Sequence, residues 1–242
     1  MLFQVEQQQD TSKVAPPRSA IKVLTVSDEI VPTIYHGSLH KRFGDVELIL
    51  GCGDLPPSYL EFIVSVLNVP CFYVPGNHDG GPEHTDYGRT IHKPDGCRNI
   101  DGRVIEHDGL VIGGLGGSIW YNGGPHQYTQ RMMTARVALL LPRILWYRQQ
   151  NGYGVDILIT HSPPAGIHDG TGTHAGFRAL RWLIDHFPPR YMIHGHIHAS
   201  YRICAARETQ LDQTRIINTS GYQVISVDRV AAWQDHRYNQ SR

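Results

Sequence analysis

The sequence CFYVPGNHD, residues 71–79, joins a short apolar run to a polar cluster. The run Cys71–Val74 is followed by the turn pair Pro75-Gly76 and then by Asn77, His78 and Asp79. A short apolar run bounded by turn residues is typical of a buried strand. The segment therefore predicts a strand that presents an amide, an imidazole and a carboxylate just beyond its carboxyl end.

The same pattern occurs at four other places along the chain. Asp28 follows an apolar run at 21–26, and Asp54 follows one at 46–50. His161 follows the run at 155–160, and both His196 and His198 follow the run at 191–193. In open α/β sheets, ligands bind beyond the carboxyl ends of the strands. Five such strand ends can therefore bring residues that are distant in sequence to one site.

The segments between these runs predict helices and a hairpin. Ser58 and Glu61 match a capping box, and the apolar residues that follow share one helix face, so 46–74 predicts a right-handed strand–helix–strand unit. Pro142 should kink a helix over 129–150 or begin a second one. The other expected elements are a loop over 82–98, a hairpin around 107–109, a helix over 177–187 and a closing pair of strands at 215–218 and 223–227.

Composition limits the class of protein. The 242 residues carry a formal net charge of zero, which argues against nucleic-acid binding through a broad basic surface. The four cysteines form no C-x-x-C pair, and no apolar run is long enough to span a membrane. Residues 1–17 lack the apolar core of a secretory signal. We therefore expect a cytoplasmic protein with a flexible tail over 1–20, a single domain over 21–230 and a second tail over 231–242.

The candidate site residues offer mixed oxygen and nitrogen ligands: carboxylates of Asp28 and Asp54, the amide of Asn77, and imidazoles of His161, His196 and His198. A set without thiolates suits Mn, Fe, Zn or Co better than a sulfur-rich zinc site or an all-oxygen calcium site. On an extended segment, residues two apart point the same way. The rings of His196 and His198 are therefore expected to face one cluster.

These motifs resemble those of the calcineurin-like metallophosphoesterases. Gly53-Asp54, the GNHD of 76–79, Thr160-His161 and the GHIH of 195–198 occur in the order of that family, within about 21–227. The resemblance implies an α/β fold, a four-layer αββα sandwich with two mixed β-sheets. It also implies metal-dependent hydrolysis of a phosphate monoester or diester by a water activated in a binuclear site, with manganese the favoured metal. There is no helix-opening G-x-G-x-x-G, so no dinucleotide site is expected.

The resemblance also implies a role for each site residue. Asp54 would bridge two divalent ions; Asn77, His161 and His196 would complete one, and Asp28 and His198 would belong to the other. His78 would stabilise charge or protonate the leaving oxygen, and Asp79 would orient the His78 ring.

The first motif departs from the family pattern. D-x-H is expected, but the chain has Asp28-Glu29-Ile30, so one imidazole ligand of the second ion is missing. That ion should bind more weakly or prefer a harder metal. Glu29 in an extended segment would point away from Asp28, and His36 could fold back from the following loop. The alternative function is a catalytically weak metal-binding or scaffold protein on the same fold.

Other polar residues near the motifs have less definite roles. His194 should alternate away from His196 and take part in packing or hydrogen bonding. The loop with His168, Asp169 and His174 either rims the site or is solvated. Four further side chains either contact substrate or have a role in the core or on the surface: Tyr35, Arg42, Trp120 and Tyr121. The expected partner is a small phosphate-ester substrate, with neither a membrane nor an extended nucleic acid.

Overall fold

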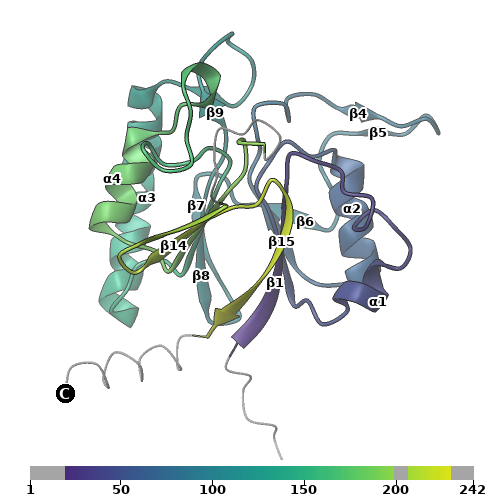
Figure 1. Ribbon diagram of the computed structural model, residues 1–242, viewed down its shortest axis with the longest axis horizontal. Helices are drawn as coiled ribbons and strands as arrows, with labels where there is room; N and C mark the ends of the chain where they lie inside the picture. Colours follow the sequence, from purple (N-terminus) through teal and green to yellow (C-terminus); the bar gives the residue numbers. More distant parts are fainter. Residues whose placement is uncertain (1–19, 199–206, 230–242) are drawn as a thin grey trace, which may run out of the picture.

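Two β-sheets face each other at the centre of the molecule, and helices cover the outer face of each (Figure 1). The structure is a computed structural model that describes residues 20–198 and 207–229. The arrangement confirms the four-layer αββα sandwich with two mixed sheets. The tails expected over 1–20 and 231–242 lie outside the described residues, apart from Ala20.

The first sheet has the strand order β15-β1-β2-β3-β6. Its four parallel strands are β1 (Ala20–Ser27), β2 (Leu48–Gly51), β3 (Cys71–Tyr73) and β6 (Cys97–Asn99). β15 (Gly221–Asp228) runs antiparallel to β1, with Ala20 opposite Asp228 and Ser27 opposite Gly221. Because both faces of this sheet are covered, Val23 and Leu24 are both fully buried although they point to opposite faces.

The second sheet has the order β13-β14-β12-β11-β8-β7. Its parallel centre comprises β8 (Leu110–Leu115), β11 (Ile157–Thr160), β12 (Tyr191–His194) and β14 (Thr214–Asn218). The antiparallel edge strands are β7 (Arg103–His107) and β13 (Glu208–Leu211). β7 and β8 form the expected hairpin, and its turn residues Asp108 and Gly109 both have positive φ, as a two-residue hairpin turn requires.

Each sheet buries one face against helices and the other against its partner sheet. α1 (Leu39–Phe43) and α2 (Pro57–Leu67) lie over the first sheet, and α3 (Gln130–Asn151) and α4 (Arg178–His186) lie over the second (Figure 1). Between the sheets, Leu50 of β2 belongs to the same buried cluster as Ile112 and Ile159 of the second sheet. Thr129 caps α3 as expected, by accepting the Met132 amide, and Pro142 lies inside this single helix rather than beginning a second one.

The capping box predicted at Ser58 and Glu61 is wrong. α2 begins at Pro57 after Pro56, and no side chain caps it. Ser58 instead donates from its amide and its hydroxyl to Glu83, while Glu61 accepts from Arg89. Proline at the first helical position has no N–H that needs a hydrogen-bond acceptor. The side chains of Ser58 and Glu61 are therefore available for contacts outside the helix.

Two connections also differ from expectation. The expected closing pair of strands is not a hairpin, because β14 pairs with β12 in the second sheet whereas β15 pairs with β1 in the first. The segment 82–98 is not a plain loop, since it contains the small hairpin of β4 (Glu83–His84) and β5 (Thr90–Ile91) and leads into β6. The remaining short elements are β9 (Ser118–Ile119), β10 (Gln127–Tyr128) and the 3₁₀ turn η1 (Gly172–His174).

A buried ion pair ties the two sheets together at the amino ends of the parallel strands. Asp156, just before β11, accepts from Arg190, just before β12, at 3.0 Å. The same Arg190 nitrogen donates to the carbonyl oxygen of Asp228, in β15 of the other sheet, at 2.7 Å. None of the helices within the described ranges has the length and apolar character that a membrane crossing requires.

Candidate metal centre

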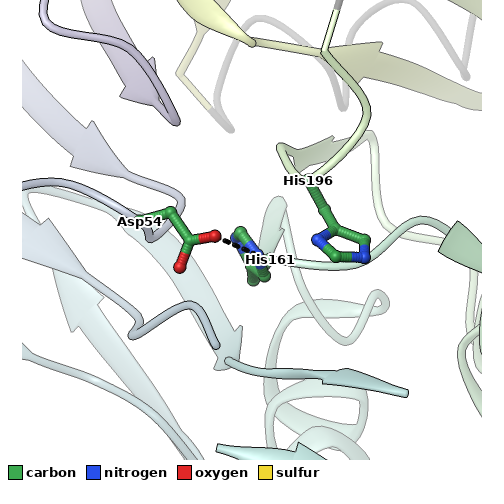
Figure 2. A group of neighbouring side chains, drawn as sticks. All are labelled: Asp54, His161 and His196. Carbon is green, nitrogen blue, oxygen red and sulfur yellow. Dashed lines mark ion pairs between the residues drawn. The ribbon is translucent and has the colours of Figure 1, made fainter. Parts of the chain in front are cut away.

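The site residues lie at the opposite edge, where the carboxyl ends of five parallel strands meet. Asp28, Asp54 and Asn77 follow β1, β2 and β3 of the first sheet. His161 and His196 follow β11 and β12 of the second. Figure 2 shows Asp54 facing the two histidine rings across the junction between the sheets. The expected convergence of strands far apart in sequence is therefore present.

Asp54, His161 and His196 form a compact group, since one ligand atom from each lies within 4.8 Å of the others. His161 Nε2 is 3.2 Å from Asp54 Oδ2 and 3.1 Å from Asn77 Oδ1. His161, Asn77 and His196 are buried, with at most 7% of each residue exposed, and Asp54 is half-buried. Four side chains from both sheets thus surround one point.

The hydrogen bonds of this group leave three acceptor atoms facing one another. His161 Nδ1 lies 2.8 Å from the Cys52 carbonyl oxygen, which only accepts, so Nδ1 carries a proton. Asn77 donates through Nδ2 to the Tyr121 hydroxyl at 3.2 Å, and this assigns its Oδ1 to the side of His161. A neutral His161 then points its Nε2 lone pair at two oxygen acceptors. These acceptors are satisfied either by a proton on His161 Nε2 or by a cation bound among them.

In the absence of a metal, the proton on His161 supplies that positive charge. Burial by itself would lower the pKa of His161, but the Asp54 carboxylate outweighs it and raises this pKa to about 9. Burial likewise opposes the ionised form of Asp54, yet the His161 charge and hydrogen bonds lower the pKa of Asp54 to about 2. The chemistry of the donor set, two neutral nitrogens, an amide oxygen and a carboxylate, fits a divalent metal at the same place.

The His196 ring is held by a loop between β11 and α4. His196 Nε2 donates to the carbonyl oxygen of Thr173 at 2.9 Å, which leaves Nδ1 as the ligand atom. Its ring centroid is 4.8 Å from that of His161 and 5.3 Å from that of His174. Burial, and next the charge of His161, lower the pKa of His196 to about 3. The loop with His174 therefore rims the site, which sequence reasoning left undecided.

Two three-residue turns place the ligands at the ends of β1 and β12. Asp28 has φ 64° and the Glu29 amide donates to the Ser27 carbonyl at 2.7 Å. His196 has φ 67° and the Ile197 amide donates to the Gly195 carbonyl at 2.8 Å. Such turns with positive φ are rare and strained, and strain of this kind persists where surrounding contacts fix it. Here the His196 amide donates to both Asp28 carboxylate oxygens at 3.0 Å, which joins the two turns.

These turns replace the extended backbone on which the expectations for His198 and Glu29 were based. The side chain of His198 is 31% exposed and its Nδ1 lies 3.5 Å from Glu29 Oε1. The Glu29 carboxylate therefore lies beside His198. Ile30, which occupies the position of the missing imidazole, is 49% exposed. His36 does not fill that position either, because it accepts the Ser38 amide within its own turn.

The motif glycines are required by close approach to the two carboxylates. A Cβ atom on Gly76 would lie 2.6 Å from the Asp54 amide nitrogen and would also overlap the Asp54 carboxylate. A Cβ atom on Gly195 would lie 2.6 Å from Asp28 Oδ2. Only glycine lets these loops pass so close to the acidic side chains.

Asp79 has a different place from the one expected. Its Oδ2 accepts the backbone amides of Asp54 at 2.9 Å and Gly76 at 2.7 Å, and the residues described show no bond from it to the His78 ring. Asp79 therefore fixes the Asp54 loop against the Gly76 loop rather than orienting His78. Burial, and to a smaller extent the Asp54 charge, raise the pKa of Asp79. The His78 amide donates to Asp54 Oδ1 at 2.8 Å, while its side chain is exposed.

The histidine that precedes the last motif packs as expected. His194 is fully buried, and its Nδ1 donates to the Gly195 carbonyl at 3.0 Å. Its Nε2 accepts from His168, which in turn accepts from Thr209. Asp169 holds its own loop by accepting the amides of Gly166 and Gly176.

Sequence reasoning missed the contributions of Thr173 and Tyr121. Thr173 acts through its backbone, so no residue type signals it. Tyr121 was expected to contact substrate or to lie in the core or on the surface, but its hydroxyl accepts from Asn77. Of the other aromatic candidates, Tyr35 packs edge-on against Tyr59 and Phe62, and Trp120 is 52% exposed.

A cavity of about 630 Å³ opens beside the metal-binding group. Asp54 and His78 form part of its wall, and Leu55, Pro57 and Pro94 contribute apolar surface. Lys93 and His92 add basic groups to the lining. A cavity of this size accommodates a small organic molecule, since small-molecule sites commonly enclose about 300–1,000 Å³.

Comparison with known proteins identifies the family. Residues 34–200, about two-thirds of the chain, match the calcineurin-like phosphoesterase family; the match includes Asp54, Asn77, His161, His196 and His198 but begins after Asp28. One solved structure superposes with a TM-score of 0.56 at 12% identity, over 87% of this chain and 99% of its own. No curated protein matches the chain.

Two named structures superpose less well. Phosphopantetheinyl hydrolase from Mycobacterium tuberculosis gives a TM-score of 0.43 at 13% identity, over 90% of this chain and 93% of its own. The calcineurin-like phosphoesterase YfkN from Bacillus subtilis gives 0.41 at 11% identity, over 92% and 98%. The extent of the family match, with the sandwich fold and the order of its motifs, shows that this chain belongs to the calcineurin-like phosphoesterase family.

Proposed function

We propose that this chain hydrolyses a small phosphate ester, monoester or diester, with a water activated between two divalent metal ions. The family supports metal-dependent phosphoester hydrolysis in general. The observation that carries the proposal is the convergence of three acceptor atoms, His161 Nε2, Asp54 Oδ2 and Asn77 Oδ1, on one point. Because His161 Nδ1 is committed to the Cys52 carbonyl, these three acceptors are satisfied either by a proton on His161 Nε2 or by a bound cation, and a divalent metal would take the place of that proton.

The residues divide into two ligand sets. Asn77, His161, His196 and Asp54 would hold one ion, and Asp28, Asp54 and His198 would belong to the other. Bound ions would supply a nucleophilic water with a pKa near 7 and neutralise the phosphoryl oxygens. Manganese is the favoured metal, because the set mixes hard oxygens with imidazoles and has no thiolate.

His78 would act on the leaving group. Its amide is anchored on Asp54 Oδ1, so the residue stays beside the metal-binding group, while its ring remains exposed in the cavity wall. A protonated imidazole there can donate its proton to the departing oxygen and so prevent a charged leaving group from accumulating. The apolar surface of Leu55, Pro57 and Pro94 suits the organic part of a small ester.

The test is hydrolysis of p-nitrophenyl phosphate and bis(p-nitrophenyl) phosphate by the metal-stripped protein with and without added Mn²⁺. We expect turnover only with metal, and its loss in Asp54→Asn, which removes the carboxylate shared by both sets. Asp185→Asn is the matched control, because Asp185 pairs with Arg181 on the surface of α4 and lies outside the site. Equal turnover of Asp54→Asn and the control would refute the proposal.

The alternative is a metal-binding or scaffold protein with little catalytic activity. Its support is Ile30, which replaces an expected ligand and is about half exposed, so it provides nothing to a metal. A folded, manganese-loaded protein that turns over neither ester would overturn hydrolysis and favour this alternative.

A further inference from the structure

We infer that Cys71 and Cys97 are a reversible redox-modification site, at which a small-molecule disulfide oxidises the two thiols to a disulfide that joins β3 to β6. Both cysteines are free thiols in the structure. The proposed hydrolysis uses neither of them. The modification itself stands on the fold, whereas its effect on substrate binding rests on the proposed function.

The register of the first sheet places the two thiols side by side. β3 and β6 are parallel neighbours, and Cys71 is directly opposite Cys97. In-register residues of neighbouring strands point to the same face of a sheet, and such strands lie about 4.7–4.9 Å apart. Both side chains accordingly pack into one hydrophobic cluster with residues of α2. A disulfide needs Cα atoms about 4.4–6.8 Å apart, so the bond can form without separating the strands.

The same register makes the disulfide strained and therefore easy to reduce. The Cβ atoms of in-register residues in parallel strands are separated by about the strand spacing, whereas a relaxed disulfide holds its Cβ atoms about 3.5–4.5 Å apart. Closing the bond must therefore draw β3 and β6 together locally. Strained disulfides are the labile, regulatory ones, and relaxed structural disulfides resist reduction by glutathione. The pair is thus suited to a switch rather than to a permanent cross-link.

The two thiols have different roles in the exchange. Cys71 is 2% exposed, whereas Cys97 is half-buried, so a small disulfide reaches Cys97 first. The Cys71 thiol donates a hydrogen bond to Cys97, which raises the pKa of Cys71 and lowers the pKa of Cys97. The nearby carboxylates of Glu61 and Asp95 oppose a thiolate, but both pair with Arg89. Cys97 is therefore the nucleophile.

The exchange balances with oxidised glutathione as the oxidant. The Cys97 thiolate attacks one sulfur of oxidised glutathione, forms a mixed disulfide and releases one glutathione thiolate. Cys71 then loses its proton and attacks the Cys97 sulfur, which releases the second glutathione thiolate. The two cysteines lose two electrons, and the two released thiolates take up the two protons. Because Cys71 is buried, its attack is the slower step.

The expected effect of the bond is on the floor of the cavity beside the metal-binding group. Two residues beyond the cysteines, Tyr73 lies opposite Asn99 in the same register, and both residues line this cavity. The Asn99 side chain is hydrogen-bonded to Tyr73. Residues two apart on a strand share a face, so drawing Cys71 toward Cys97 also shifts this pair. Oxidation should therefore change substrate binding more than the chemistry at the metal.

The competing explanation is that the two thiols only fill space in the cluster. The experiment exposes the full-length protein to oxidised glutathione, then counts its thiols by maleimide labelling in denaturant and intact-mass spectrometry. Every protein carries Cys204→Ser, so three cysteines remain. Among them Cys52 is the internal reference, because it is fully buried and donates to the Ile193 carbonyl. Cys71→Ala and Cys97→Ala are the test variants, and circular dichroism checks that each is folded.

We expect the thiol count to fall from three to one, with the loss of two hydrogen atoms from the intact mass. Reduced glutathione should restore all three thiols without denaturant. Cys71→Ala should stop at the mixed disulfide and gain one glutathione, whereas Cys97→Ala should keep both of its thiols. After desalting and loading with Mn²⁺, the oxidised protein should have a KM for p-nitrophenyl phosphate at least about twofold higher than the reduced protein, at constant kcat. Oxidant should leave the KM of Cys97→Ala unchanged.

Distinct results separate the failures. Three thiols after oxidation would overturn the inference, as would a stable mixed disulfide on Cys97 while Cys71 is present. A disulfide that survives reduced glutathione would also overturn it, because the bond would then be a structural cross-link. An unchanged KM would overturn the effect on the cavity. No turnover by the reduced, Mn²⁺-loaded protein would instead overturn the proposed function, and the thiol counts would stand.

Discussion

Replacing Asp79 by alanine should destabilise the junction between the two strand-end loops. Asp79 Oδ2 accepts the amides of Asp54 and Gly76 at 2.9 and 2.7 Å. A hydrogen bond to a charged group contributes about 1.5–3 kcal/mol, so two give about 3–6 kcal/mol. Relief of repulsion between Asp79 and Asp54 offsets part of this loss, which leaves about 3 kcal/mol. For a domain of this size, that corresponds to a fall of about 6–12 °C in the melting temperature.

The assay is urea unfolding of metal-stripped protein, followed by Mn²⁺ titration of the folded variant. Asp79→Asn keeps an oxygen acceptor without the charge, so its loss of stability should fall between those of the wild type and Asp79→Ala. Metal affinity should fall with stability, because Asp54 and Asn77 flank the loosened junction. If Asp79→Ala keeps wild-type stability and metal binding but loses turnover as His78→Ala does, Asp79 acts through His78 and our reasoning is refuted.

Three further outcomes are expected. His78→Ala should lower kcat by about 10²–10⁴-fold while bound metal, measured by atomic emission, stays unchanged; loss of metal would exclude a role limited to the leaving group. Asp156→Ala should lower the free energy of unfolding by about 3–5 kcal/mol in urea, because Arg190 remains as a buried charge; a loss below 1 kcal/mol would contradict this. Free Mn²⁺ at 100 times its Kd should raise the unfolding free energy by about 2.7 kcal/mol in the wild type and by much less in Asp54→Asn, in matched urea curves with and without chelator.

The sequence predicted the strand ends well because each is marked twice, by a buried apolar run and by the polar residue that follows it. Asp28, Asp54, Asn77, His161 and His196 all occur just beyond such runs, and the structure brings these strand ends together. Sequence could not predict which sheet receives β14 and which receives β15. No local sequence signal distinguishes the two sheets, and the choice depends on long-range packing of β14 beside β12 and of β15 beside β1.

The details of the site were harder to predict because they depend on backbone conformation. Positive φ at Asp28 and at His196 reverses the chain, and no residue-type rule requires it at either position. The extended geometry assumed for Glu29 and His198 failed for this reason. Asp79 was assigned to its sequence neighbour His78, although its carboxylate reaches Asp54, which is 25 residues earlier.

The pairing of β1 with β15 has a consequence for synthesis of the protein. These strands align from Ala20 opposite Asp228 to Ser27 opposite Gly221, so one edge of β1 has no partner until about 200 further residues have been made. At about 5–20 residues per second, that interval is roughly 10–40 s. During it, the nascent chain carries an unpaired apolar edge that is prone to aggregation.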